Sequence, residues 1–386
     1  MASFLKIKRV LLNRHRASFS LVEMVVSLGV LMLLLAIIAA VTQGTMLAIH
    51  KSTGNLSTFA AARTAFDTVN QELAQATLNT YVDYYGTTPS STSLSVQTSS
   101  NNSTTTGSTF TPVTYGRVSN LQFLVKQNSN PATTFNTAGS AGSTGYGQEV
   151  YFQCPEASST NQYYQSTPGL LNACGFYVQY CSDSGYEPQY TTGNSMISNV
   201  KYRYRLMQAI EPSESLQVYA DAISDNTAWT ANIANTGPWP TATALAPDAI
   251  PLADNVIAMV IWPRLPLDQD AVGTNLAPNY YYDSQYETAP VASSTSASGY
   301  AQPLTADQLP PIVQVTLVVI DEASAARLCT SSTPPTVIET ALKGLFINPA
   351  NYETDLASLQ ASLIANHINF QVLNTSIVMR ESKWSQ

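Results

Sequence analysis

The longest apolar segment of the chain lies near its N-terminus. No charged residue occurs from Met24 to Ile49, and the polar interruptions there are serine, threonine, glutamine and glycine. At a rise of about 1.5 Å per residue, residues 24–41 alone give a helix of about 27 Å, which is enough to cross the hydrocarbon core of a membrane. The pattern therefore predicts a transmembrane helix over residues 19–49.

An amphipathic helix is predicted directly after this segment, over residues 50–82. Its apolar residues recur at alternating spacings of three and four, which places them on one stripe of a helix. The polar residues Arg63, Asp67, Gln71 and Glu72 fall on the other faces. This stripe could dock on a sheet of the same chain or form a coiled coil with a neighbouring chain. Six positions are few for a coiled coil, which favours docking. The stripe consists of Phe59, Ala62, Phe66, Val69, Leu73 and Ala76.

Residues 83–386 show mainly strand patterns separated by Ser/Thr-rich segments. The Ser/Thr-rich segments cannot bury a core, so we expect exposed loops or disorder at 86–112, 128–147, 156–169 and 288–302. Helices are predicted at 321–328 and 353–365. Strands are predicted at 118–126, 149–154, 200–209, 216–219, 255–262, 312–320 and 369–379. The fold class is therefore α+β, with a long N-terminal helix, a mainly antiparallel β-sheet and Ser/Thr-rich loop insertions.

A basic leader and one acidic residue flank the apolar segment. Residues 1–18 hold five lysine and arginine residues and no acidic residue, so the N-terminus is expected in the cytoplasm and the rest outside it. Glu23 lies just inside the apolar run, where an ionised group costs about 2.5–3.5 kcal/mol, and it is therefore a functional candidate. Two plainer interpretations are a signal peptide cleaved near Ala39-Ala40 and a simple membrane anchor.

The basic leader, the segment Phe19-Ser20-Leu21-Val22-Glu23 and the apolar helix together resemble the N-terminal signal of type IV prepilins. The resemblance implies that a prepilin peptidase cuts between Ser18 and Phe19 and methylates the new amine of Phe19. It also implies that Glu23, the fifth residue of the processed chain, serves assembly. The family usually has glycine where this chain has Ser18. In a medium of low dielectric the new amine and the Glu23 carboxylate can neutralise each other, within one chain or between neighbours.

Later segments resemble two related groups. Residues 59–67 with Glu72-Leu73 are similar to the helix of type II secretion minor pseudopilins of the J class. Residues 253–264, 310–328 and 369–384 are similar to the Verru_Chthon cassette protein C family. The resemblance spans most of the chain, with the Ser/Thr-rich loops as its variable parts. It implies a pilin-like fold in an exported, pseudopilin-like protein.

Charge and cysteine content narrow the class of protein further. The formal net charge is −8, and loss of the leader would leave 12 basic against 25 acidic residues, which argues against a nucleic-acid partner. Four cysteines outside the cytoplasm suggest disulfides. Cys174 and Cys181 enclose a short segment and are the predicted bridge, with Cys154–Cys329 as a weaker pairing. The spacing lacks C-x-x-C and histidine is scarce, so no metal site is predicted.

No catalytic or cofactor-binding residue is predicted. The chain has three histidines and lacks the G-x-S-x-G, P-loop and G-x-G-x-x-G motifs. Asp321 and Glu322 are expected to cap the helix that follows them, rather than to act in catalysis or bind calcium. Asp268, Asp270 and Asp283 flank a tyrosine-rich loop, for which calcium binding, a recognition surface and a buried turn all stay open.

These observations favour a structural subunit over an enzyme. The expected protein is a minor pseudopilin-like subunit of a type II secretion or type IV pilus-like assembly. It would sit in the inner membrane, with its ectodomain in the periplasm or in a surface filament, and its partners would be prepilin peptidase and other pilin-like subunits. The alternative is a membrane-tethered module that binds carbohydrate or a surface polymer through Trp229, Trp239 and Tyr280–Tyr282.

Overall fold

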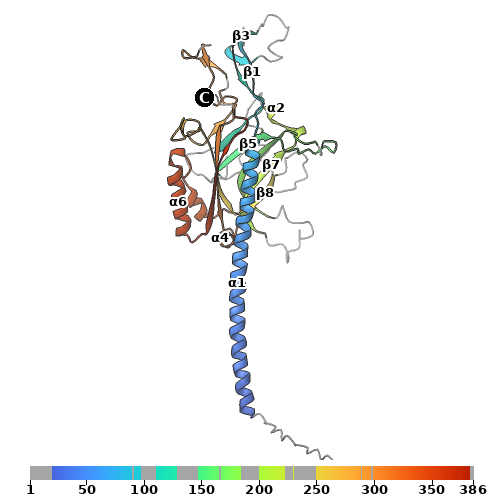
Figure 1. The fold of residues 1–386 in the computed structure, drawn as a ribbon, viewed down its shortest axis with the longest axis vertical. Helices are drawn as coiled ribbons and strands as arrows, with labels where there is room; N and C mark the ends of the chain where they lie inside the picture. The colour runs from blue at the N-terminus through green and yellow to red at the C-terminus, as the bar shows by residue number, and fades with distance from the viewer. Residues whose placement is uncertain are drawn as a thin grey trace, which may run out of the picture. The chain divides into compact units, whose positions relative to one another are not determined.

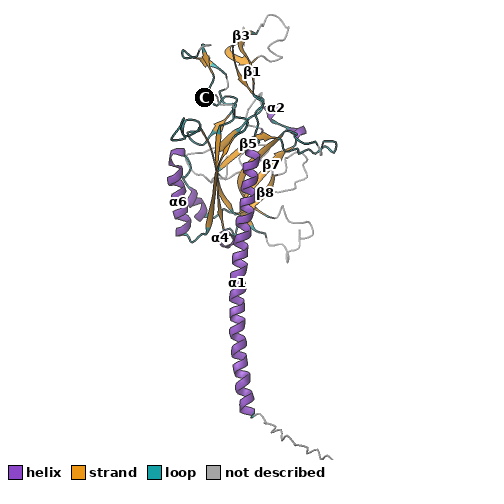
Figure 2. Cartoon of the chain, in the orientation of Figure 1, coloured by secondary structure: helices purple, strands orange, loops and turns teal. Residues whose placement is uncertain are grey.

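The chain is an α+β protein in which an N-terminal apolar helix precedes antiparallel sheets, as the sequence predicted (Figure 2). Its contacts divide it into two compact units, residues 1–53 and residues 54–386. The computed structural model describes residues 20–88, 91–96, 110–127, 147–164, 167–183, 200–221, 229, 249–287, 289–296 and 299–382.

Helix α1 runs without a break from Leu21 to Leu73. The sequence predicted two helices, over 19–49 and 50–82, whereas α1 continues through Gly44 and Gly54 on either side of that boundary. A single glycine inside a helix costs only about 1 kcal/mol, which is too little to stop a long helix. The chain turns after Leu73, and Thr77 pairs with Gln153 in an isolated β-bridge, so the predicted end at residue 82 is nine residues too late.

The larger sheet has six strands in the order β10-β4-β5-β6-β7-β8, all antiparallel. The predicted strand 118–126 is confirmed only at its end, in β4, because the Ser119 hydroxyl accepts from the backbone N–H of Leu121 and turns the chain between β3 and β4. The strands are β4 (Leu124–Gln127), β5 (Gln148–Cys154), β6 (Asn172–Ser182), β7 (Tyr202–Glu211), β8 (Ala249–Asp254) and β10 (Tyr282–Asp283).

The second sheet has the order β14-β13-β9, again antiparallel. Its strands are β9 (Val256–Arg264), β13 (Ile312–Ile320) and β14 (Phe370–Val378). Helix α6 (Tyr352–Ala365) lies along one face of this sheet, and the six-stranded sheet lies toward the other face (Figure 1). The hydroxyl of Tyr352 is 2.7 Å from Thr316 Oγ1 on β13. Two shorter helices, α4 (Glu322–Leu328) and α5 (Thr336–Leu342), precede α6.

Strands β1 (Tyr81–Thr88), β2 (Ser91–Val96) and β3 (Thr111–Val118) form a three-stranded sheet, and β11 (Val291–Ala292) pairs with β12 (Tyr300–Ala301). Three short strands, β2, β11 and β12, lie inside segments predicted as loops, and β1 and β3 extend into the ends of the predicted loop 86–112. The predicted strand 216–219 is instead a turn and the start of α2 (Val218–Asp221), which follows the 3-10 turn η1 (Ser213–Ser215). A second 3-10 turn, η2 (Pro349–Asn351), leads into α6.

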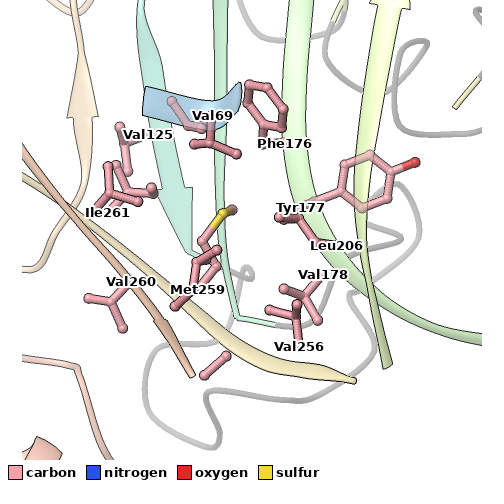
Figure 3. Packing of buried hydrophobic residues seen from close by; sticks show 14 of the residues in the cluster. Val69, Val125, Phe176, Tyr177, Val178, Leu206, Val256, Met259, Val260 and Ile261 are labelled. Carbon is pink, nitrogen blue, oxygen red and sulfur yellow. The ribbon is translucent and has the colours of Figure 1, made fainter. Parts of the chain in front are cut away.

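The predicted stripe of α1 docks on the sheets, as expected. Ala62, Phe66, Val69 and Leu73 are buried. Val69 points between the strands toward Val125 and Phe176 of the larger sheet, with Met259 of β9 beneath it (Figure 3). The hydrophobic core of residues 54–386 is therefore shared by α1 and both sheets.

Between β8 of the larger sheet and β9 of the second sheet there is one residue, Asn255. Its φ is 65°, a left-handed conformation that asparagine tolerates better than most residues. Its backbone N–H donates to the carbonyl of Tyr204 on β7 (2.7 Å), and its carbonyl accepts from the N–H of Ile320 on β13 (2.9 Å). Its side-chain amide donates to Glu322 Oε2 (2.8 Å).

Candidate functional site

One helical segment in the described part of the chain, Leu21–Met46, is long and apolar enough to cross a membrane. Its Leu, Ile, Val and Met side chains are each at least 50 % exposed. An apolar surface of this length is unfavourable in water and is typical of a segment that contacts lipid or other proteins. The predicted apolar helix is therefore present, while its orientation in a membrane stays a prediction.

Glu23 lies in the first turn of this helix, which begins at Leu21. A negative charge is favourable at this end, because the first backbone N–H groups of a helix have no helical partner and carry partial positive charge. The side chain is exposed, as is that of Ser27 one turn later. Ser18 and Phe19, the predicted cleavage and methylation positions, lie outside the described residues, so the pairing of Glu23 with an amine stays a prediction.

The predicted disulfide between Cys174 and Cys181 is wrong. Both residues lie on β6, and the seven residue steps of extended strand from one to the other span about 23 Å. A disulfide requires α-carbons within about 7 Å. The short segment that the two cysteines enclose is part of the strand that pairs with β5 and β7.

Cys174 instead meets Cys154, which lies on the neighbouring strand β5. Their Sγ atoms are 2.9 Å apart and both residues are buried. The weaker predicted pairing of Cys154 with Cys329 is therefore not the one that the strands favour, because the nearest sulfur to Cys154 comes from β6. The two cysteines are twenty residues apart in sequence, and only the register of β5 and β6 brings them together.

A buried carboxyl group covers this cysteine pair. Glu72 of α1 is 6 % exposed, although the helical periodicity placed it off the apolar stripe. Its Oε1 accepts from Gln208 Nε2 on β7 (2.5 Å), and its Oε2 has no hydrogen-bond partner. One carboxylate oxygen and the two sulfurs lie within 4.8 Å of one another. Burial, and then the charge of Glu156, raise the pKa of Glu72 to about 8.

Asp321, Glu322 and Asp270, three of the acidic residues singled out in the sequence, have partners within the protein. Asp321 Oδ1 accepts from the N–H of Ser324 (3.0 Å), which confirms the predicted cap of α4. Glu322 pairs with Arg203 on β7 (2.7 Å). Asp270 accepts from the N–H groups of Gly273 and Asn275, so its two oxygens shape a turn.

The aromatic residues proposed for carbohydrate binding are mostly buried. Trp229 and Tyr280 are fully buried, Tyr282 is 1 % exposed, and Tyr281 is 37 % exposed. The Tyr282 hydroxyl donates to the carbonyl of Gln308, as expected for a tyrosine in a packed turn. Trp239 lies outside the described residues. The tyrosine-rich loop is therefore a buried turn, and the alternative of a binding module loses most of its contact residues.

Comparison of the chain with known protein families, with curated proteins and with solved structures found no match. The case for a function therefore depends on the N-terminal motif, the apolar helix that follows it and the packing of residues 54–386.

Proposed function

We propose that the chain is a minor pseudopilin-like structural subunit. It is inserted in the inner membrane by its N-terminal helix, processed by prepilin peptidase between Ser18 and Phe19, and assembled with other pilin-like subunits through that helix. Its pilin-like ectodomain lies in the periplasm or at a filament tip, in a type II secretion or type IV pilus-like system.

The observation that carries this proposal is the double character of α1. Residues 21–46 of this one helix are apolar and exposed, while Ala62, Val69 and Leu73 belong to a folded core. A cleaved signal peptide would not be expected to continue as the central helix of the domain that it exports. A plain anchor would leave the acidic Glu23 in an apolar run without a purpose.

The mature N-terminus tests the processing step. The chain is produced in a bacterium that has a prepilin peptidase, and the membrane-extracted protein is analysed by mass spectrometry. We expect it to begin at N-methylated Phe19, and a peptidase-deficient strain should yield the uncut chain. The variant Ser18→Gly should be cut at least as completely, because glycine is usual before the cut. A native product that begins at Met1 or beyond Ala40 would contradict the proposal.

The role of Glu23 is tested separately. The variant Glu23→Leu should insert normally but recover several-fold less of other proteins carrying F-[ST]-L-x-E in a pulldown from membrane extracts. Ser27→Ala, one turn further along the same face, is the matched control and should recover them as the wild type does. Equal recovery by Glu23→Leu would remove the assembly role of this carboxylate.

A further inference from the structure

The pair Cys154 and Cys174 has the geometry of a cross-strand redox site. In the antiparallel register Phe152 lies opposite Cys174, and Cys154 lies opposite Asn172. Directly opposed residues share a face of the sheet, so both cysteines point to the same face and are diagonal neighbours. Their sulfurs, 2.9 Å apart, are closer than two unbonded sulfur atoms normally approach.

We propose that Cys154 and Cys174 form a structural disulfide that joins β5 to β6 beneath α1. The bridge is assigned to these two residues alone, and Cys181 and Cys329 stay as thiols. The oxidant is an external disulfide, such as a disulfide oxidoreductase or oxidised glutathione, so formation in the cell relies on the ectodomain location given under the proposed function.

The reaction is a thiol–disulfide exchange in two steps. One cysteine thiolate attacks a sulfur of the oxidant, which forms a mixed disulfide and releases one thiolate of the oxidant. The second cysteine thiolate then attacks the protein sulfur of the mixed disulfide and releases the other. Two protein thiols are oxidised, the oxidant disulfide is reduced to two thiols, and the two protons pass to the released thiolates.

The surroundings indicate when the bridge forms. Both cysteines are buried, and Glu72 of α1 lies over them. The hydrogen bond to Cys154 and burial raise the pKa of the Cys174 thiol well above its usual value, so the folded pair is a poor nucleophile. The exchange therefore takes place as the domain folds, before α1 closes over the strands.

A metal ion is the competing use of this cluster, because one carboxylate and two sulfurs form a partial zinc ligand set. Two thiolates on one tetrahedral zinc ion, at about 2.3 Å each, lie about 3.8 Å apart. The observed separation of 2.9 Å is shorter than that and favours a bond between the sulfurs.

The test uses the full chain, purified from membranes in detergent. Reduced protein is incubated with oxidised glutathione in mild denaturant, returned to buffer, alkylated and mapped by mass spectrometry. We expect one linked peptide pair, Cys154 with Cys174, and alkyl labels on Cys181 and Cys329. The matched control is the double variant Cys181→Ser/Cys329→Ser, which should form the same bridge, whereas Cys154→Ser should form none.

Three chemical results would overturn the proposal, and a stability measurement gives a fourth. They are separate labels or separate glutathione adducts on Cys154 and Cys174, a bridge that pairs either residue with Cys181 or Cys329, and stoichiometric zinc retained by the reduced protein with both thiols protected. In the double variant the oxidised form should also unfold at a higher denaturant concentration than the reduced form, and an equal or lower midpoint would equally count against it. Because the oxidant is supplied in vitro, these results do not depend on where the ectodomain lies in the cell. Failure of the disulfide proposal can therefore be told apart from failure of the proposed function.

Discussion

Asn255 has a left-handed backbone and hydrogen-bonds to both sheets at the connection between β8 and β9. We expect Asn255→Ala to lower the free energy of unfolding by about 1–2 kcal/mol, because alanine is strained at a φ of 65° and loses the bond to Glu322. Asn255→Gly relieves the strain but not the lost bond, so it should be less harmful than Asn255→Ala. Denaturant unfolding of the full chain in detergent checks both, and a milder effect for alanine than for glycine would contradict this account.

Glu72 should make stability depend on pH. Its pKa is about 8 in the folded protein against an ordinary value of 4.5, so between these pH values the folded chain keeps a proton that the unfolded chain has released. The free energy of unfolding should therefore fall as pH rises through this window, by roughly 2–4 kcal/mol, and level off above it.

The variant Glu72→Gln isolates this contribution, because glutamine can keep the bond to Gln208 and does not titrate. Unfolding of wild type and variant is compared at pH 5 and at pH 8. The variant should be the more stable of the two at pH 8 and should show the flatter profile, although Asp307, whose pKa burial raises to about 7, still titrates in both proteins. Identical profiles would mean that the Glu72 carboxyl group is not desolvated in the folded state.

The sequence predicted the role of a single residue where its interaction partners are close in the chain. The cap at Asp321 depends on a side chain and a backbone N–H three residues away, and it was predicted correctly. Glu72 was not, because its burial arises from Gln208, Cys154 and Cys174 on three other strands. The cysteine pairing failed for the same reason, since it depends on the register of β5 and β6.

At the scale of the element, α1 should respond differently to the same substitution at two of its leucines. Leu73 is fully buried in the core, and Leu73→Ala should cost about 2–5 kcal/mol of unfolding free energy. Leu56 on the same helix is 72 % exposed, and Leu56→Ala should change the free energy of unfolding by less than about 0.5 kcal/mol. Comparable losses at the two positions, measured by denaturant unfolding, would contradict the docking of α1.

Strands were predictable where their pattern was continuous. Strands β5, β7, β9, β13 and β14 and helices α4 and α6 lie close to their predicted bounds. Strand β6 was missed because its two cysteines suggested a disulfide, and β2 because its Ser/Thr-rich sequence resembles a linker. Polar residues can form strands when a neighbouring edge supplies the hydrogen bonds, and nothing in a single segment reveals that edge.

At the scale of the whole molecule, the basic leader and the apolar helix predict where residues 54–386 lie. Alkaline phosphatase fused after the last residue of the chain should be active in a bacterial host, because the enzyme folds only outside the cytoplasm. Replacing Leu33 and Leu34 in the apolar helix by lysine should abolish that activity, since each charge there opposes insertion by about 2.5–3.5 kcal/mol. Full activity of the lysine variant would show that α1 does not insert as proposed.

The arrangement of strands in space was beyond the sequence. The order β10-β4-β5-β6-β7-β8 places β4 and β10 side by side although more than 150 residues separate them in the chain. Local sequence patterns predict that a segment forms a strand. Which strands pair depends on how the apolar faces are buried across the whole core.

The connection at Asn255 has a consequence for how residues 54–386 unfold. Asn255 hydrogen-bonds to β7 in one sheet and to β13 in the other. Unfolding of either sheet would therefore break a hydrogen bond to the other sheet. Heat should then melt both sheets in one cooperative step. Trp229 packs against Tyr151 of β5 in the larger sheet, and Trp262 lies on β9 of the second sheet. Fluorescence from variants in which either one is the sole remaining tryptophan should therefore give coincident midpoints.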